Sequence, residues 1–510
     1  MSKFSTIVSL VHSLSKAEKR QFKLYSSLQK GEKDYVALFQ VIEKYHNEEA
    51  IKKAFENRCK GSVFTVATKH LYKVLTDSLL QLKMGQDKES ALHTELLKAT
   101  ILLDKSLYRE GFEVLHKVQR DAEAYEQYIL LLLAARMELN YLNSLNFPGL
   151  TEKELQKKQG KIEEVIRYIK NSHQHSTLYE ILKCRLAYKG HVRTDEQKKE
   201  LNDLVVSEMT IMANPLAFTV ESAKIHLLFQ ANYFITINDY ISALKAFYEL
   251  IELLEEHRYL WIDSPVDYLV SIEGILDSLR TIGQFESMNF FLDKLAKLPR
   301  QTGQFEVMIQ RVNYIYILSS YTDRGQYRKA LLLPGKFKES LFDKIDMLDP
   351  NKQAEVFLYT ALIYFGNNDL DKSHLYLGKV LFKGKQYYKL PVFQTFRLLH
   401  LLIHHEMGND DVVMNELRSV KRTMFSGQRK TYRVEKIIFS FVQLSGQSLS
   451  NKEKTALAEK YKSMFLAIGS EKNEIQVLKI FDFASWIESK ITGRTFEEVV
   501  NNKLKRFESA

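Results

Sequence analysis

The chain has 510 residues, more than a single compact core usually supports, so several domains or a repeat array are expected. Its 7 Pro and 20 Gly are few for this length and it has no sustained period-2 run, which predicts an all-α fold. Only two cysteines occur, which excludes a disulfide framework. The net charge of +10 is concentrated in residues 1–90 (+6) and 379–436 (+7), a hint of an anionic partner.

Residues 1–90 predict a small basic helical module. Ser15 and Glu18 have the spacing of a capping box and open a helix that runs to about Leu28. Further helices are expected at 33–46, 48–57 and 62–83. The spacing of four cations places them on one face of the first helix. They are Lys16, Lys19, Arg20 and Lys23.

The N-terminus does not read as a signal peptide, because serines interrupt its short apolar stretch and no cleavage site follows. The longest apolar run, residues 128–135, is far shorter than the ~20 residues that span a bilayer. We therefore expect a cytoplasmic protein with no membrane partner.

Residues 91–450 contain an internal repeat. Six segments share a turn residue, an aromatic or apolar residue two positions later, a small or apolar residue after five, and, in most of them, an apolar residue after nine. Their turn residues are Ser106, Asn238, Gly283, Gly325, Asn368 and Gly408. From Asn238 onward these starts lie 45, 42, 43 and 40 residues apart, a period of about 42.

Small residues recur in three of these segments, one on the first helix and one twelve positions later on the second. The pairs are Ala99 with Gly111, Ala231 with Ala243, and Ala361 with Ser373. Small residues let the two helices of a hairpin approach closely. This pattern resembles the tetratricopeptide repeat, although that repeat has a period of 34 residues. The resemblance, which extends to long-repeat helical proteins of bacteria, implies an α-solenoid of antiparallel helical hairpins.

The array also departs from this family. Leu276 and Leu318 stand where a small residue is expected, and Asp410 stands at an aromatic position. Pro334 falls within an expected second helix, which it should break or kink. Between Ser106 and Asn238 the pattern is weaker, and His175 is expected in a polar turn between two hairpins. Their helices are predicted at 124–144, 151–171, 176–190 and 194–213.

The resemblance implies a scaffold or adaptor whose concave groove binds a protein or peptide. The first helices of the hairpins would line that groove, at 217–235, 305–321, 353–365 and 391–406. Candidate groove-binding residues are Lys224, Asn232, Arg311, Asn313 and Arg397. Residues 451–510 are expected to form a C-terminal helical cap, because the end of a solenoid otherwise exposes apolar surface.

The alternative is a regulator whose basic N-terminal module binds nucleic acid while the solenoid senses a ligand or partner. Convergent cations favour phosphate, and interleaved aromatic residues can stack on bases. Besides the four cations of the first helix, a second anion-binding group is expected near the other end. It comprises Lys421, Arg422, Arg429, Lys430 and Arg433.

No arrangement of residues predicts catalysis. His400 and His404 share a helix face, as in the zinc motif H-E-x-x-H, but Leu401 replaces its glutamate and no third ligand is identifiable. We therefore interpret these histidines as packing or groove-lining residues, and we expect no metal, no cofactor and no enzymatic activity.

Overall fold

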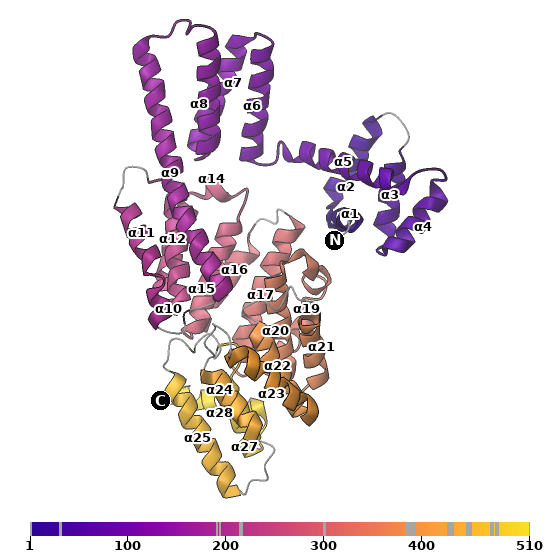
Figure 1. Cartoon of the computed structure of the whole chain (residues 1–510), viewed down its shortest axis with the longest axis vertical. Coiled ribbons are helices and arrows are strands. Elements are labelled where there is room, and N and C mark those ends of the chain that lie inside the picture. The colour runs from indigo at the N-terminus through magenta and orange to yellow at the C-terminus, as the bar shows by residue number, and fades with distance from the viewer. Residues whose placement is uncertain are drawn as a thin grey trace. The chain divides into compact units, whose positions relative to one another are not determined.

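The computed structural model describes residues 3–29, 33–189, 192, 195–213, 218–298, 302–382, 393–425, 433–444, 451–469, 474 and 479–508. These residues form helices and no strand, which confirms the all-α prediction for the described chain (Figure 1). They divide into two compact units, residues 1–169 and 170–510. Among the described helices, none is both long and apolar enough to cross a bilayer.

The N-terminal helices close around a core of their own. They are α1 (Lys3–Ser13), α2 (Lys16–Leu28), α3 (Asp34–Lys44), α4 (Glu48–Arg58) and α5 (Phe64–Lys83). Phe22, Phe39 and Phe55 are fully buried in this core. The Ser15 capping box is present as predicted: Glu18 N donates to Ser15 Oγ at 3.3 Å, and Ser15 N donates to Glu18 Oε2 at 2.7 Å. Helix α1 was not predicted.

The remainder of the first unit contains α6 (Lys88–Asp104), α7 (Tyr108–Ala124), α8 (Tyr128–Ser144) and the beginning of α9 (Glu152–Lys189). The predicted break in α9 near His175 is wrong, because this helix is continuous over 38 residues. No Gly or Pro occurs at the expected turn, and the polar side chain of His175 finds a carboxylate partner, Glu208. The predicted polar turn is therefore the buried face of a helix.

The second unit continues from the end of α9 through the helices that follow, with Figure 1 showing their order. They are α10 (Asp195–Lys199), α11 (Asn202–Met212), α12 (Val220–Thr236), α13 (Tyr240–Glu256), α14 (Arg258–Trp261), α15 (Val266–Thr281), α16 (Phe285–Ala296), α17 (Gly303–Asp323), α18 (Tyr327–Ala330), α19 (Leu333–Lys336), η2 (Phe342–Met347), α20 (Pro350–Gly366), α21 (Leu370–Leu381), α22 (Phe393–Glu406), α23 (Asp410–Phe425), α24 (Arg433–Leu444), α25 (Asn451–Gly469), α27 (Phe483–Thr492) and α28 (Phe496–Glu508). Successive helices pack as hairpins, among them α12 with α13, α15 with α16, α20 with α21, and α22 with α23.

Each predicted turn residue ends the first helix of a hairpin in the left-handed conformation. Their φ angles are 62° (Ser106), 61° (Asn238), 79° (Gly283), 70° (Gly325), 60° (Asn368) and 71° (Gly408). The following residue donates its backbone N–H to the carbonyl five positions back, as Asp239 does to Phe234 at 2.8 Å. This is the Schellman arrangement, which satisfies the last carbonyls of a helix. The six predicted turns are confirmed.

In the hairpin whose turn residue is Gly325, the second helix is interrupted near Pro334, where a break was predicted. Two four-residue helices, α18 and α19, and the 3₁₀ helix η2 replace it. Pro334 is the second residue of α19, in the first turn, where the amide hydrogen that proline lacks would have no partner within the helix.

Close helix approach occurs at predicted and unpredicted positions. Ser373 Oγ donates to the Ala361 carbonyl at 2.8 Å, so this pair of small residues touches directly. In the hairpin where Leu276 replaces a small residue, the close approach lies at Gly274. A methyl group at this glycine would lie 2.1 Å from Cζ of Phe247 on α13. Gly274 therefore joins one hairpin to the one before it.

Replacing Gly274 with alanine should destabilise the second unit by about 1–3 kcal/mol, because the buried Phe247 ring must move. Both tryptophans of the chain, Trp261 and Trp486, are buried in this unit, so urea unfolding followed by tryptophan fluorescence reports on it. Gly335→Ala is the control, since open space surrounds Gly335. Equal midpoints for the two variants would contradict the prediction.

Candidate functional site

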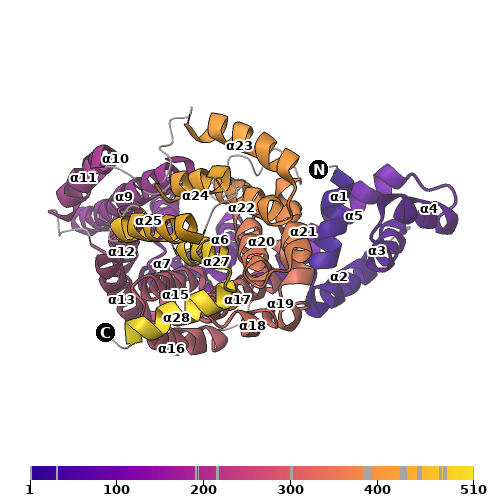
Figure 2. The same ribbon diagram turned by 90° about the horizontal axis from the view of Figure 1, so that it is seen from below.

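A cleft of about 890 Å³ lies within the second unit, between its central helices and its C-terminal helices. One wall comes from α15, α17 and α20, which contribute Arg280, Leu318 and Leu362 respectively. The other comes from α25, α27 and α28, which contribute Phe465 and Leu466 among others. Figure 2 views the C-terminal helices, in yellow, from below. The C-terminal helices therefore form one side of a cleft, and their predicted role as a cap stays a prediction.

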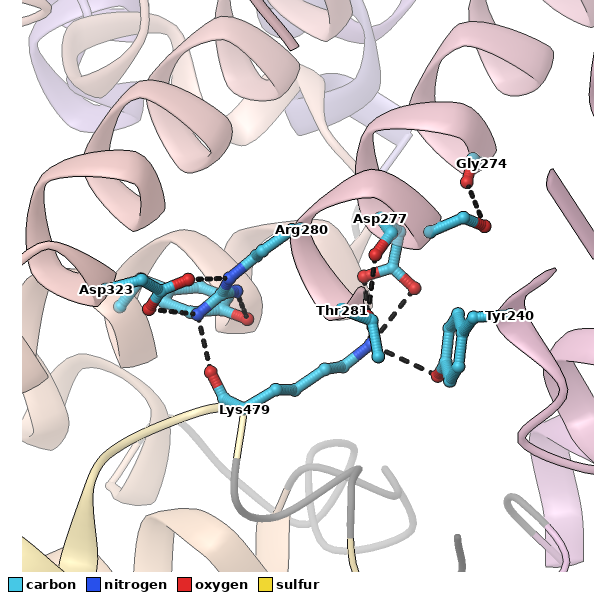
Figure 3. A network of polar contacts seen from close by, with 9 residues as sticks. Tyr240, Gly274, Asp277, Arg280, Thr281, Asp323 and Lys479 are labelled. Atoms are coloured by element: carbon cyan, nitrogen blue, oxygen red, sulfur yellow. Dashed lines mark hydrogen bonds and ion pairs between the residues drawn. The ribbon is translucent and has the colours of Figure 1, made fainter. Parts of the chain in front are cut away.

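Arg280 lines the cleft and connects its two walls through the polar contacts drawn in Figure 3. Its guanidinium donates to both oxygens of Asp323, at 2.7 and 3.1 Å, and to Tyr359 Oη at 2.9 Å. It also donates to the backbone carbonyl of Lys479 at 2.5 Å. Only 2% of the Arg280 side chain is exposed, so these four bonds replace its hydration.

Lys479 makes the second contact between the walls. Its ammonium group donates to both carboxylate oxygens of Asp277, at 2.9 and 3.0 Å, and to Tyr240 Oη at 3.3 Å (Figure 3). Burial acts to lower the pKa of Lys479, but the Asp277 carboxylate outweighs it and raises that pKa well above its usual range. Two cations face two carboxylates, so the network is neutral overall and its chemistry is that of a structural support.

The exposed part of the cleft lining combines apolar surface with cations. Lys462 and Leu466 lie one turn apart on α25, and the Leu466 side chain is 70% exposed. Arg494, between α27 and α28, is also exposed at the cleft. Among the described residues, neither Lys462 nor Arg494 has an ion-pair partner, whereas Lys503 is paired with Asp482 at 2.7 Å. The exposed part of the lining therefore includes a leucine, a lysine one turn away on the same helix, and an arginine from the segment between α27 and α28.

The five predicted groove residues lie outside this cleft. Three of them are cations in ion pairs: Lys224 with Asp267 at 2.7 Å, Arg311 with Glu273 and Glu355 at 2.5 Å each, and Arg397 with Glu416 at 3.1 Å.

The two predicted groove asparagines differ in burial. Asn232 is buried and donates to the Leu228 carbonyl at 2.8 Å, while Asn313 is half-buried on α17. The cations and Asn232 thus contact the protein's own groups, and the groove assignment stays a prediction.

The predicted anion-binding residues are only partly described. Lys19 and Lys23 on α2 share Glu43, at 3.2 and 3.6 Å, while Lys16 and Arg20 are exposed. Glu43 thus offsets part of this positive face, and nucleic-acid binding there stays a prediction.

In the second basic group, Arg433 begins α24 and is exposed. Lys421 and Arg422 belong to α23, but their side chains, like Arg429 and Lys430 as a whole, lie outside the described residues.

A histidine–carboxylate cluster was missed by the sequence analysis. His175 on α9 and His226 on α12 both direct Nδ1 at Glu208 Oε1 on α11, His175 at 3.1 Å. Burial acts to raise the pKa of Glu208, but the two histidine hydrogen bonds outweigh it and hold that pKa below its usual range. His175 and His226 lie 33 and 18 residues from Glu208 in the sequence and belong to other helices, so no local spacing reveals the cluster.

The structure also gives His400 and His404 the third neighbour that sequence spacing could not supply, His374 on α21.

Comparisons with known proteins give no relative from which a function could be transferred: no family model, curated protein or solved structure matches this chain.

Proposed function

We propose that this chain is a non-enzymatic scaffold of the tetratricopeptide-like solenoid class that binds a short acidic and apolar segment of a partner protein. In this proposal the segment enters the cleft between the repeat helices and the C-terminal helices. The adaptor role is the one predicted from the sequence, but the proposed binding surface is the cleft and not the concave groove.

Three exposed residues of the cleft lining carry this proposal: Lys462, Leu466 and Arg494. A leucine side chain exposed by 70% beside a cleft is surface that gains from burial against an apolar partner side chain. The two cations lack ion-pair partners among the described residues and can each receive a carboxylate. An anchor residue flanked by acidic groups complements this arrangement.

The charge of the whole lining supports the same ligand. Its charged members are the cations Arg280, Lys462, Lys479, Arg494 and Lys503 and the acids Asp323, Asp482 and Glu488. Asp277 pairs with Lys479 beside this lining, so five cations face four acids, an excess of one positive charge. The cleft volume of about 890 Å³ admits several side chains of an extended segment.

Panning a random peptide library on the full chain should enrich sequences with Asp or Glu near Leu or Phe. For an enriched peptide, fluorescence anisotropy should show at least about tenfold weaker binding to the double variant Lys462→Glu, Arg494→Glu. Loss of one charge-assisted contact, about 1.5–3 kcal/mol, corresponds to such a factor.

The matched control reverses two exposed lysines that do not line the cleft, Lys245→Glu with Lys329→Glu, and should bind as the unmodified chain does. Equal losses in the two double variants would indicate a nonspecific charge effect and contradict the proposal. Enrichment of no common motif would contradict it as well.

A further inference from the structure

Three imidazoles converge where α21 meets α22. His374 lies on α21, and His400 and His404 lie one turn apart on α22. One ring nitrogen from each histidine lies within 4.8 Å of the other two. The Nε2 atoms of His400 and His404 are 3.0 Å apart, and the ring centre of His374 is 5.6 Å from that of His400 and 5.2 Å from that of His404. All three side chains are half-buried.

This grouping is costly unless the rings stay neutral. Burial and the neighbouring His404 lower the pKa of His400 to about 4, and burial followed by His374 lowers the pKa of His404. Neutral imidazole is the form that carries a nitrogen lone pair and binds a metal ion. His400 therefore offers a ligand nitrogen at neutral pH without first losing a proton.

The Glu208 cluster shows the alternative way to accommodate histidines. There one carboxylate oxygen, Glu208 Oε1, faces the Nδ1 atoms of both imidazoles, whereas Glu208 Oε2 and His175 Nε2 are buried without a hydrogen-bond partner among the described residues. In the His374 cluster the short polar contact joins two imidazoles, His400 and His404, and one of the two must accept. No carboxylate is part of this contact, so a bound cation can take the place of the shared hydrogen between the two nitrogens.

Asn409 provides an outer contact that can orient one ligand. Its amide lies 3.0 Å from His404 Nδ1, and it follows Gly408 in the turn that ends α22. The two ends of an asparagine amide can exchange by rotation, so the amide oxygen can accept the Nδ1 hydrogen. This leaves His404 Nε2 free to ligate, in the manner of hydrogen-bonded histidines at metal sites.

We propose that His374, His400 and His404 bind a zinc-class divalent ion through three imidazole nitrogens, with water completing the coordination. Ligand nitrogens at about 2.0–2.1 Å from Zn²⁺ in a tetrahedral site lie about 3.3 Å from one another, which the 3.0 Å nitrogen separation approaches. Imidazole ligands suit zinc, copper, nickel and iron ions over magnesium or calcium. The ion would connect α21 to α22, and thus one hairpin to the next.

The test uses the full chain, stripped with a chelator and titrated with Co²⁺ and then Zn²⁺. We expect one Co²⁺ per chain at this site, detected by visible absorption and displaced by Zn²⁺. His374→Ala and His404→Ala should each weaken binding about a hundredfold or more, since losing an outer contact alone costs about 10–100-fold. X-ray absorption of the Zn²⁺ complex should count three imidazoles.

Two controls separate this site from other histidines. His405→Phe changes the adjacent residue on α22, whose ring lies by Trp486 outside the cluster, and should leave metal affinity unchanged. His226→Gln alters the Glu208 cluster and should also leave it unchanged. Absence of metal binding, fewer than three imidazoles, or loss of binding only in His226→Gln would each overturn the proposal.

Discussion

Replacing Arg280 with methionine should lower the free energy of unfolding of the second unit by about 3–5 kcal/mol. The substitution leaves the Asp323 carboxylate, the Tyr359 hydroxyl and the Lys479 carbonyl without their shared donor. Methionine keeps much of the apolar stem, so the loss reports on the polar contacts. The Arg280 side chain is only 2% exposed, and it contacts three segments that lie far apart in sequence.

Urea unfolding followed by tryptophan fluorescence measures this effect, since Trp486 lies on α27, in the wall that Arg280 holds. Arg324→Met is the matched control: Arg324 pairs with Glu286 at 3.0 Å, but 87% of the Glu286 side chain is exposed. Exposed pairs contribute about 0–1 kcal/mol. A loss for Arg280→Met no larger than for this control would show that the C-terminal wall does not depend on the network.

The hairpin turns could be predicted because each depends on residues a few positions apart. Asn238, Gly283 and Asn368 tolerate the left-handed conformation that ends a helix, and each is followed at fixed distance by the next helix. The interruption at Pro334 could be predicted for the same reason, because it depends on the backbone of that residue alone. The capping box at Ser15 needs only four consecutive residues.

The cleft could not be predicted, because its parts meet across long sequence separations. Lys479 and Asp277 are 202 residues apart, and neither stands in a recognisable motif. Likewise His374 joins His400 only after α21 and α22 have packed together. The continuity of α9 was missed for a different reason: polar residues suggested a turn, whereas a buried partner makes the same residues acceptable in a helix.

Arg311 gives the second large expected effect, and it also tests the predicted groove. Its guanidinium bridges Glu273 on α15 and Glu355 on α20, with 3% of the arginine side chain exposed. Arg311→Met should destabilise the second unit by about 3 kcal/mol, because both carboxylates lose their cation and then repel each other. A groove cation reserved for a partner would cost far less to remove.

Restoring charge balance should recover much of that stability. The triple variant Arg311→Met, Glu273→Gln, Glu355→Gln replaces the triad with neutral side chains of similar size, and such replacements are often neutral or stabilising. Urea unfolding of the single and triple variants measures the recovery, with Glu273→Gln, Glu355→Gln as the reference that keeps Arg311. The single variant could instead lose less than about 1 kcal/mol of unfolding free energy, the value for an exposed ion pair. Arg311 would then be available to a ligand, and the concave groove would again be the expected binding surface. A large loss that the triple variant reverses means instead that Arg311 holds three successive first helices together, and that partners must be sought at the cleft.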